Sequence, residues 1–89
     1  MHTLSKKEVG NWVLLDCIAQ KHVLEEKISF LEKKYSTDFQ SFEQAVNLAT
    51  TEDFAAWDDY IEWMAHRKFL SELLSKIEDI RNGHFQMAY

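Results

Sequence analysis

Residues 50–83 have the sequence TTEDFAAWDDYIEWMAHRKFLSELLSKIEDIRNG, and nothing in them interrupts a helix before the final Asn-Gly. Thr50 or Thr51 is expected to cap this helix, because a hydroxyl there accepts a bond from an amide of the first turn. Gly83 is expected to end it in the left-handed conformation. The predicted helix covers about residues 51–82 and is roughly 45 Å long, and the rest of the chain is arranged around it.

The apolar side chains of this helix recur at helical spacings in two runs, Phe54, Trp57, Ile61, Met64 and Phe69, Leu73, Ile77, Ile80. Spacings of three and four predict a buried stripe, with Trp57 in the core. Other apolar side chains widen the stripe, namely Tyr60, Trp63, Leu70 and Leu74. A helix that is apolar over so much of its circumference is expected to contact more than one neighbour.

A second long helix is predicted over about residues 6–35. It begins either at a Ser5 cap or later, with Gly10 marking the start and Asn11 as the cap. Its apolar seam alternates spacings of three and four, as in a coiled coil: Leu14, Cys17, Lys21, Leu24, Ile28, Leu31 and Tyr35. Further apolar side chains flank the seam, namely Val13, Ile18, Val23 and Phe30. This width predicts a bundle or hairpin packed on two sides.

A short helix is predicted over about residues 38–49, capped within Ser36–Asp38 and lying across the ends of the two long helices. In the tail, residues 84–89, large apolar side chains alternate with others, which is typical of extended structure. The tail either folds back along the bundle or adds a strand to a partner's sheet. With no proline and two glycines in 89 residues, the sequence predicts one all-α domain, a long helical hairpin with a short connecting helix and an extended C-terminal tail.

The net charge of −5 and a pI near 5.2 argue against nucleic-acid binding, which needs clustered Lys and Arg. An acidic surface suits a basic protein partner; the alternative is that the charge only keeps the chain soluble. The single cysteine, Cys17, excludes an internal disulfide and suits a reducing cytoplasm. Neither a secretory signal nor an apolar run long enough for a membrane span is recognisable.

No catalytic signature is recognisable, so we expect a protein that is not an enzyme and that needs no cofactor. Cys17 lies on the apolar seam, where a thiol is inert packing, and two isolated glycines cannot form a phosphate-binding loop. Asp58, Glu62 and His66 share one helical face and suggest a divalent metal site. HExxH and a matching motif on the first helix are absent, so a solvated polar face is preferred and metal binding is the alternative.

Trp63, Tyr60 and Arg67 are predicted to form a partly exposed aromatic–arginine patch, because Trp57 and Trp63 are six residues apart and cannot share one face closely. Tryptophan and arginine carry much of the energy in protein interfaces. The alternatives are a place for Trp63 at the edge of the core, or stacking of Arg67 on Trp63 within the monomer.

The segment EDFAAWDDYIEWMAHRKFL, followed by SKIEDIRNGHFQMA, resembles the C-terminal half of small bacterial proteins that look like antitoxin components of toxin–antitoxin pairs. The resemblance covers about residues 39–88. It rests on the WDDYIEW sequence at residues 57–63 and on matches at Ile77, Asp79, Ile80, Arg81, Gly83 and Phe85. It departs at Met64 and His66, where the family has Lys and Tyr. The resemblance implies a partner protein, an enzyme domain held inactive.

The sequence therefore predicts an acidic, dimeric helical module that binds and occludes a partner protein, such as a basic toxin or enzyme. The expected contact residues are Asp58, Asp59, Glu62, Trp63 and Arg67 on the long helix, with Phe85, Met87 and Tyr89 on the tail. The alternatives are a structural homo-oligomer and a metal-binding bundle that uses Asp58, Glu62 and His66.

Overall fold

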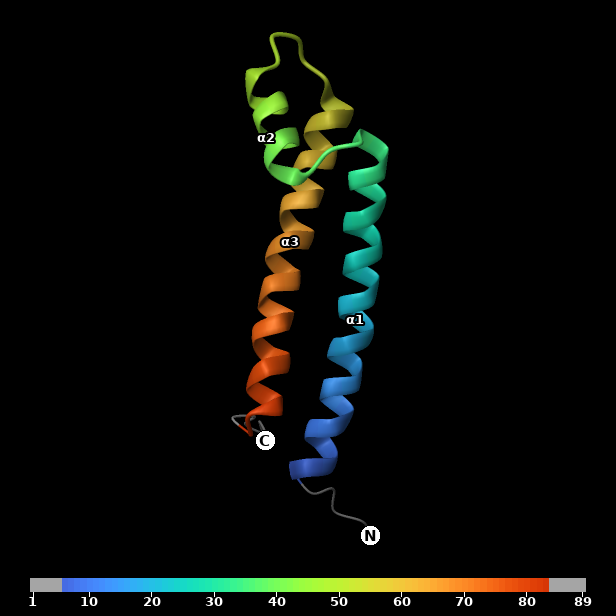
Figure 1. Cartoon of the computed structure of the whole chain (residues 1–89), viewed down its shortest axis with the longest axis vertical. Helices are drawn as coiled ribbons and strands as arrows, with labels where there is room; N and C mark the ends of the chain where they lie inside the picture. Colours follow the sequence, from blue (N-terminus) through green and yellow to red (C-terminus); the bar gives the residue numbers. More distant parts are fainter. Residues whose placement is uncertain (1–5, 84–89) are drawn as a thin grey trace.

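The structure is a computed structural model that describes residues 6–83. It contains three helices, α1 (Lys6–Tyr35), α2 (Phe39–Leu48) and α3 (Phe54–Arg81). Figure 1 shows α1 and α3 side by side and antiparallel, with α2 against the first turns of α3 at the closed end of the hairpin. The predicted all-α helical hairpin is confirmed, and the part of the chain that the structure describes contains no strand. The expected extended tail lies outside these residues.

Helix α1 runs from Lys6 through a buried Gly10, so the chain takes the earlier of its two expected starts. At the other end, Ser36 adopts the left-handed region with φ 51°. The N–H of Thr37 then donates to the carbonyl of Glu32 at 3.2 Å. This closing bond satisfies a carbonyl that the helix end would leave unpaired, and it turns the chain towards α2.

Aspartates cap the other two helices. Asp38 accepts a bond from the N–H of Ser41 at 2.8 Å, which confirms the expected cap of α2. Asp53 accepts from the N–H of Ala56 at 3.1 Å and caps α3. The expectation of a threonine cap was therefore wrong: Thr50 and Thr51 lie in the connection, and Asp53 directly precedes the first helical residue. Gly83 has φ 76°, as predicted for the residue that follows the helix.

The predicted seam of α1 faces α3. Cys17, Leu24 and Leu31 are buried along it, and Leu14, Ile28 and Tyr35 pack against the same core. Val23 and Phe30, which were expected to be covered by packing on a second side, are exposed. A single pair of helices buries only the stripe between them, so the outer part of the wide apolar face remains open in one chain.

The seam of α3 differs from the predicted stripe. Apart from Tyr60, its buried or half-buried residues alternate spacings of three and four from one end to the other: Ala56, Asp59, Trp63, His66, Leu70, Leu73, Ile77 and Ile80. The second predicted run is correct from Leu73 onward, although Phe69 is exposed. The first run, Phe54 to Met64, lies outside the core. Asp59 and His66 occupy seam positions, and their polarity hid the pattern.

Two groups of buried residues hold the hairpin together. The closed-end cluster consists of Leu31, Phe39, Phe42 and Trp63, from all three helices. The open-end cluster consists of Cys17, Leu24, Leu73 and Ile77, from α1 and α3 alone. Helix α2 packs only against the first part of α3. The closed end of the hairpin therefore contains three helices, and the rest of it contains two.

Candidate functional site

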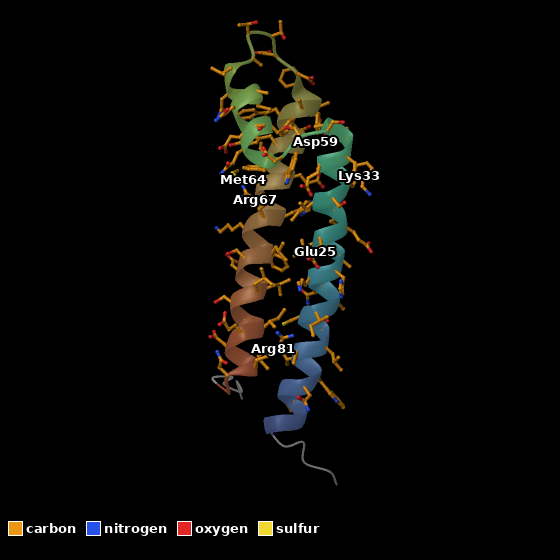
Figure 2. The ribbon with its side chains drawn as sticks, in the orientation of Figure 1. Glu25, Lys33, Asp59, Met64, Arg67 and Arg81 are labelled. Carbon is orange, nitrogen blue, oxygen red and sulfur yellow. The ribbon has the colours of Figure 1, made fainter. Side chains whose placement is uncertain are left out.

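An uncovered apolar stripe runs along the first three turns of α3. It consists of Phe54, Trp57, Ile61 and Met64, which are 73%, 45%, 46% and 45% exposed. Figure 2 places Met64 on the side of α3 that is turned away from α1. We call these four residues the α3 stripe. Exposed apolar side chains that gather on one helix face, rather than being scattered, are typical of a binding surface.

A cleft adjoins the start of the α3 stripe, where the end of α2 and the connection approach α3. It has a volume of about 300 Å³ and is lined by Val46, Ala49, Thr51, Glu52, Asp53, Phe54, Ala56 and Trp57. Phe54 and Trp57 belong to both the stripe and the cleft. The apolar surface therefore continues from the helix into a concavity with two carboxylates at its edge.

Negative charge is concentrated around this surface. Residues 50–66 contain Glu52, Asp53, Asp58, Asp59 and Glu62 and no Lys or Arg. Asp58 is exposed, and it adjoins the α3 stripe because it is four residues after Phe54 and three before Ile61. The stripe ends at Lys68, which is four residues beyond Met64.

Asp59 does not offer a free carboxylate. Its oxygen accepts from Lys34 Nζ at 2.7 Å and from the hydroxyl of Tyr35, and its side chain is 17% exposed. The bonds from Lys34 and Tyr35 hold the pKa of Asp59 below its ordinary value. The bond to Asp59 raises the pKa of Lys34, while burial, with the bond to Asp59, raises that of Tyr35. Asp59 therefore joins α3 to α1 and contributes to the fold.

Trp63 was expected in an exposed patch, and this expectation was wrong. It is 1% exposed and packs between Phe39 and Phe42, with ring centroids 5.5 Å and 5.4 Å away. Its Nε1 has no hydrogen-bond partner within the described residues. Trp57, expected in the core, is on the exposed stripe. The two tryptophans have exchanged roles because the α3 seam passes through Trp63.

The predicted neighbours of Trp63 also have other contacts. Arg67 is exposed, and its guanidinium carbon lies 4.3 Å from the ring centroid of Phe39 on α2. The hydroxyl of Tyr60 donates to a carboxylate oxygen of Glu43 at 2.7 Å, which raises the pKa of Tyr60. Both side chains therefore fasten α2 to α3. The predicted Trp63–Tyr60–Arg67 patch is not one exposed surface.

Glu62 and His66 lie on another side of α3, where they line a groove between α1 and α3. His66 Nε2 is 3.7 Å from Glu62 Oε1, and the histidine side chain is 15% exposed. Asp58 does not join them, and residues 6–83 contain no group of three His, Cys, Asp or Glu side chains placed to hold a metal. The three predicted candidates are therefore divided between two surfaces.

The remaining predicted residues are the three of the tail and Cys17. Phe85, Met87 and Tyr89 lie outside the described residues. Cys17 is a buried free thiol of the open-end cluster. None of the three helices has the length and apolar content that a membrane crossing requires.

No protein-family model, curated protein or solved structure matches the chain.

The sequence contains a pattern that identifies which face of α3 packs on α1 and which face stays exposed. The seam residues of α3 keep the alternation of three and four over its whole length, whereas the run from Phe54 to Met64 stops at Lys68. The longer repeat identifies the face that packs on α1. It is recognised only if Asp59 and His66 are accepted as seam residues.

Proposed function

We propose that this protein is a helical binding module that recognises and occludes a basic partner protein through the α3 stripe. The observation that carries the proposal is the stripe itself, four large apolar side chains left exposed beside Asp58 and an acidic cleft. Aromatic and aliphatic anchors supply binding energy when a partner removes them from water.

Charge indicates the kind of partner. Glu52, Asp53 and Asp58 adjoin the α3 stripe or its cleft, and no Lys or Arg occurs among residues 50–66. Among the described residues, Asp59 is paired with Lys34, and Glu62 lies 3.7 Å from His66. An acidic rim accelerates encounter with a basic surface and disfavours acidic competitors. The protein would act by covering the partner's surface, with no chemistry of its own.

The resemblance of residues 39–88 to antitoxin-like proteins supports the same proposal. Under it the partner is a basic toxin or other enzyme domain that the helical module holds inactive. Phe85, Met87 and Tyr89 would add a strand to the partner, in the manner of an extended segment that pairs with a sheet edge. The cytoplasm, where such pairs operate, is the proposed compartment.

The test is a comparison of tagged variants in a pull-down from host extract, followed by titration with the purified captured protein. A double variant, Trp57→Ser with Ile61→Ser, removes the centre of the stripe. The control is Leu15→Ser, which changes an apolar residue of α1 that is 66% exposed. We expect the double variant to lose at least about a hundredfold in affinity, or roughly 3 kcal/mol, and the control to bind normally.

The partner must also be basic, bind less tightly as salt rises, and lose its own activity in the complex. A captured protein that binds both variants equally, or an acidic one, would contradict the proposal. Removal of His84–Tyr89 tests the tail separately. The truncated chain should bind more weakly with unchanged helicity by circular dichroism, and equal binding would remove the tail from the proposal.

A further inference from the structure

The hairpin has two broad faces, and α2 covers only one of them. Phe39 and Phe42 of α2 pack against Tyr35 of α1 and Trp63 of α3. The opposite face carries a groove of about 350 Å³ between α1 and α3, to which α2 contributes no residue. We call it the open face. We propose that a second copy of this chain covers the open face, with the closed ends of both hairpins on the same side.

Large apolar side chains border the groove on the open face. Val23 and Phe30 of α1 line it and are 50% and 65% exposed. On α3, Glu62 lines the groove, and Phe69 lies seven residues further along the same edge, with 46% exposure. These residues are at the edges of a two-helix layer, which is where a second helical layer would pack in a four-helix bundle.

The internal register fixes the level of each residue along the hairpin. Tyr35 bonds Asp59, and Cys17 shares a cluster with Ile77, so numbers rise on α1 as they fall on α3. By this register Phe69 is level with Glu25, which Figure 2 marks near the middle of α1. Phe30 is level with Met64 and Ala65, beside the groove.

A two-fold axis parallel to the helices places α1 of the second copy over α3 of the first, at the same levels. Phe69 then lies between the levels of Val23 and Phe30 of the second copy. Phe30 of the second copy lies over Ala65 and the groove. Val23, Phe30 and Phe69 thereby meet apolar or small neighbours, so that each gains burial.

Charges agree with this arrangement. Glu26 and Lys27 of α1 and Glu62 of α3 line the groove, and Lys33, seven residues beyond Glu26, is exposed at a level similar to that of Glu62. At the open end, Asp16 of one copy lies level with Lys76 of the other. Glu26 and Glu72 are at similar levels with like charge, but both are exposed positions where repulsion is screened. The open face thus matches itself after the two-fold rotation, as an isologous interface requires.

The opposite arrangement, with closed ends at opposite ends, fits less well. With the two-fold axis at the level of Phe69, it places α3 against α3, where Phe69 meets its own copy and Glu62 meets Lys76. It also places Phe30 over Gln20 of the second copy, which leaves the most exposed apolar side chain of this face against a polar one. In that register, the position of Phe30 favours the same-end dimer.

The available area is also adequate. A helix of thirty residues is roughly 45 Å long, and the molecule is 20 Å wide across α1 and α3 in the view of Figure 1. One face therefore has a projected area of roughly 900 Å², comparable with the roughly 800 Å² of accessible surface that each partner of a stable standard-size interface buries.

Sedimentation equilibrium of the full chain over a range of concentrations tests the proposal. We expect a dimer, with a melting temperature that rises with protein concentration. Phe30→Asp and Phe69→Asp place a carboxylate inside the interface and should each raise the dimer dissociation constant at least about a hundredfold. Ile61→Asp, on the α3 stripe, should leave the dimer unchanged. Circular dichroism shows whether each variant remains helical.

A charge exchange gives a second readout that does not depend on apolar packing. Lys33→Glu and Glu62→Lys should each weaken the dimer several-fold, and their combination should restore it. Spin labels at Thr50→Cys, in a Cys17→Ala background, report the orientation. Labels at the same end are separated only across the bundle, whereas the opposite arrangement adds an axial separation of roughly 45 Å.

A monomer at all concentrations would overturn the proposal. So would a dimer that Ile61→Asp dissociates and Phe30→Asp does not, because the second copy would then occupy the α3 stripe. Labels separated by the length of the hairpin would overturn the same-end arrangement. These outcomes are independent of partner binding, since the open face and the α3 stripe carry different variants.

Discussion

The closed end and the open end of the hairpin bury their apolar side chains in different ways. The closed-end cluster brings side chains from three helices together around Trp63, whose neighbours include the aromatic rings of Phe39 and Phe42. The open-end cluster has the thickness of two helices and is made of Cys17, Leu24, Leu73 and Ile77. A tryptophan is buried to 1% exposure at the closed end, whereas the open end covers only smaller side chains.

This difference shows what a third layer does for a small helical protein. Two helices can bury the seam between them and little else, so a large side chain needs α2 above it. We therefore expect local unfolding to begin at the open end, where fewer apolar contacts must be broken. We also expect the closed end to retain its geometry and to hold the α3 stripe in place.

The largest expected effect comes from Trp63→Ala. It empties the centre of the closed-end cluster and should cost about 3–5 kcal/mol in free energy of unfolding, a large fraction of the stability of a small domain. Trp57→Ala, at a half-exposed tryptophan on the same helix, is the matched control and should cost less than about 1 kcal/mol. Urea denaturation followed by circular dichroism measures both.

If Trp63→Ala proves too unstable to purify, Trp63→Phe tests the same cluster. Phenylalanine keeps an aromatic ring beside Phe39 and Phe42 and removes the Nε1 group, which has no hydrogen-bond partner among residues 6–83. Its cost should be less than half that of the alanine variant. Equal costs for the variants of Trp57 and Trp63 would contradict the assignment of the core.

A smaller effect is expected from Leu73→Ala in the open-end cluster. Leu73 is buried, but two helices can move together more easily than three, so the cavity should partly close. The cost should be about 2 kcal/mol, at the low end of the range for such changes. Hydrogen exchange should show protection lost first around Cys17 and Ile77. Uniform loss along both long helices would mean that the two ends unfold as one unit.

The smallest effect concerns Asp59, which joins α1 to α3 at the closed end. Asp59→Asn weakens the charge-assisted bond from Lys34 and should cost about 1 kcal/mol near pH 7. The bond from Tyr35 can persist, because the amide oxygen still accepts. Leu15→Ser, an exposed change on the outer side of α1, serves as the control.

The pKa shifts of Asp59, Tyr35 and Lys34 predict how the free energy of unfolding changes with pH. The pKa of Asp59 is lowered in the fold, so its contribution is present above the ordinary value of 3.8 and is lost as pH falls below it. The pKa values of Tyr35 and Lys34 are raised, so their contributions are lost as pH rises above about 10. The Asn variant should lose less stability in acid than the natural chain. A parallel acid profile would show that Asp59 is not the group responsible.

Much of the fold was predictable from the sequence. The seam of α1 repeats without interruption from Leu14 to Tyr35, and Asp38 and Gly83 carry the local chemistry of a helix start and a helix end. These signals depend on neighbouring residues alone. The antiparallel hairpin follows from two long helices and a short connection.

The candidate site was predictable only in part. Asp58 was correctly expected to be an exposed acidic side chain, and Arg67 is exposed as well. The choice between Trp57 and Trp63 was wrong, because both lie on apolar runs with helical spacing. No local property of either tryptophan distinguishes the two runs; the difference is that the repeat through Trp63 continues along the whole of α3, whereas the run that contains Trp57 stops at Lys68.

The sequence by itself determined three helices, their order and the face of α1 that packs. The tertiary structure decided which side of α3 meets that face, because Lys34 and Tyr35 supply partners for Asp59 and α2 supplies a cover for Trp63. Asp59 can occupy the seam because its partners Lys34 and Tyr35 come from another helix. Those contacts left Phe54, Trp57, Ile61 and Met64 exposed, and thereby set the surface that the protein offers.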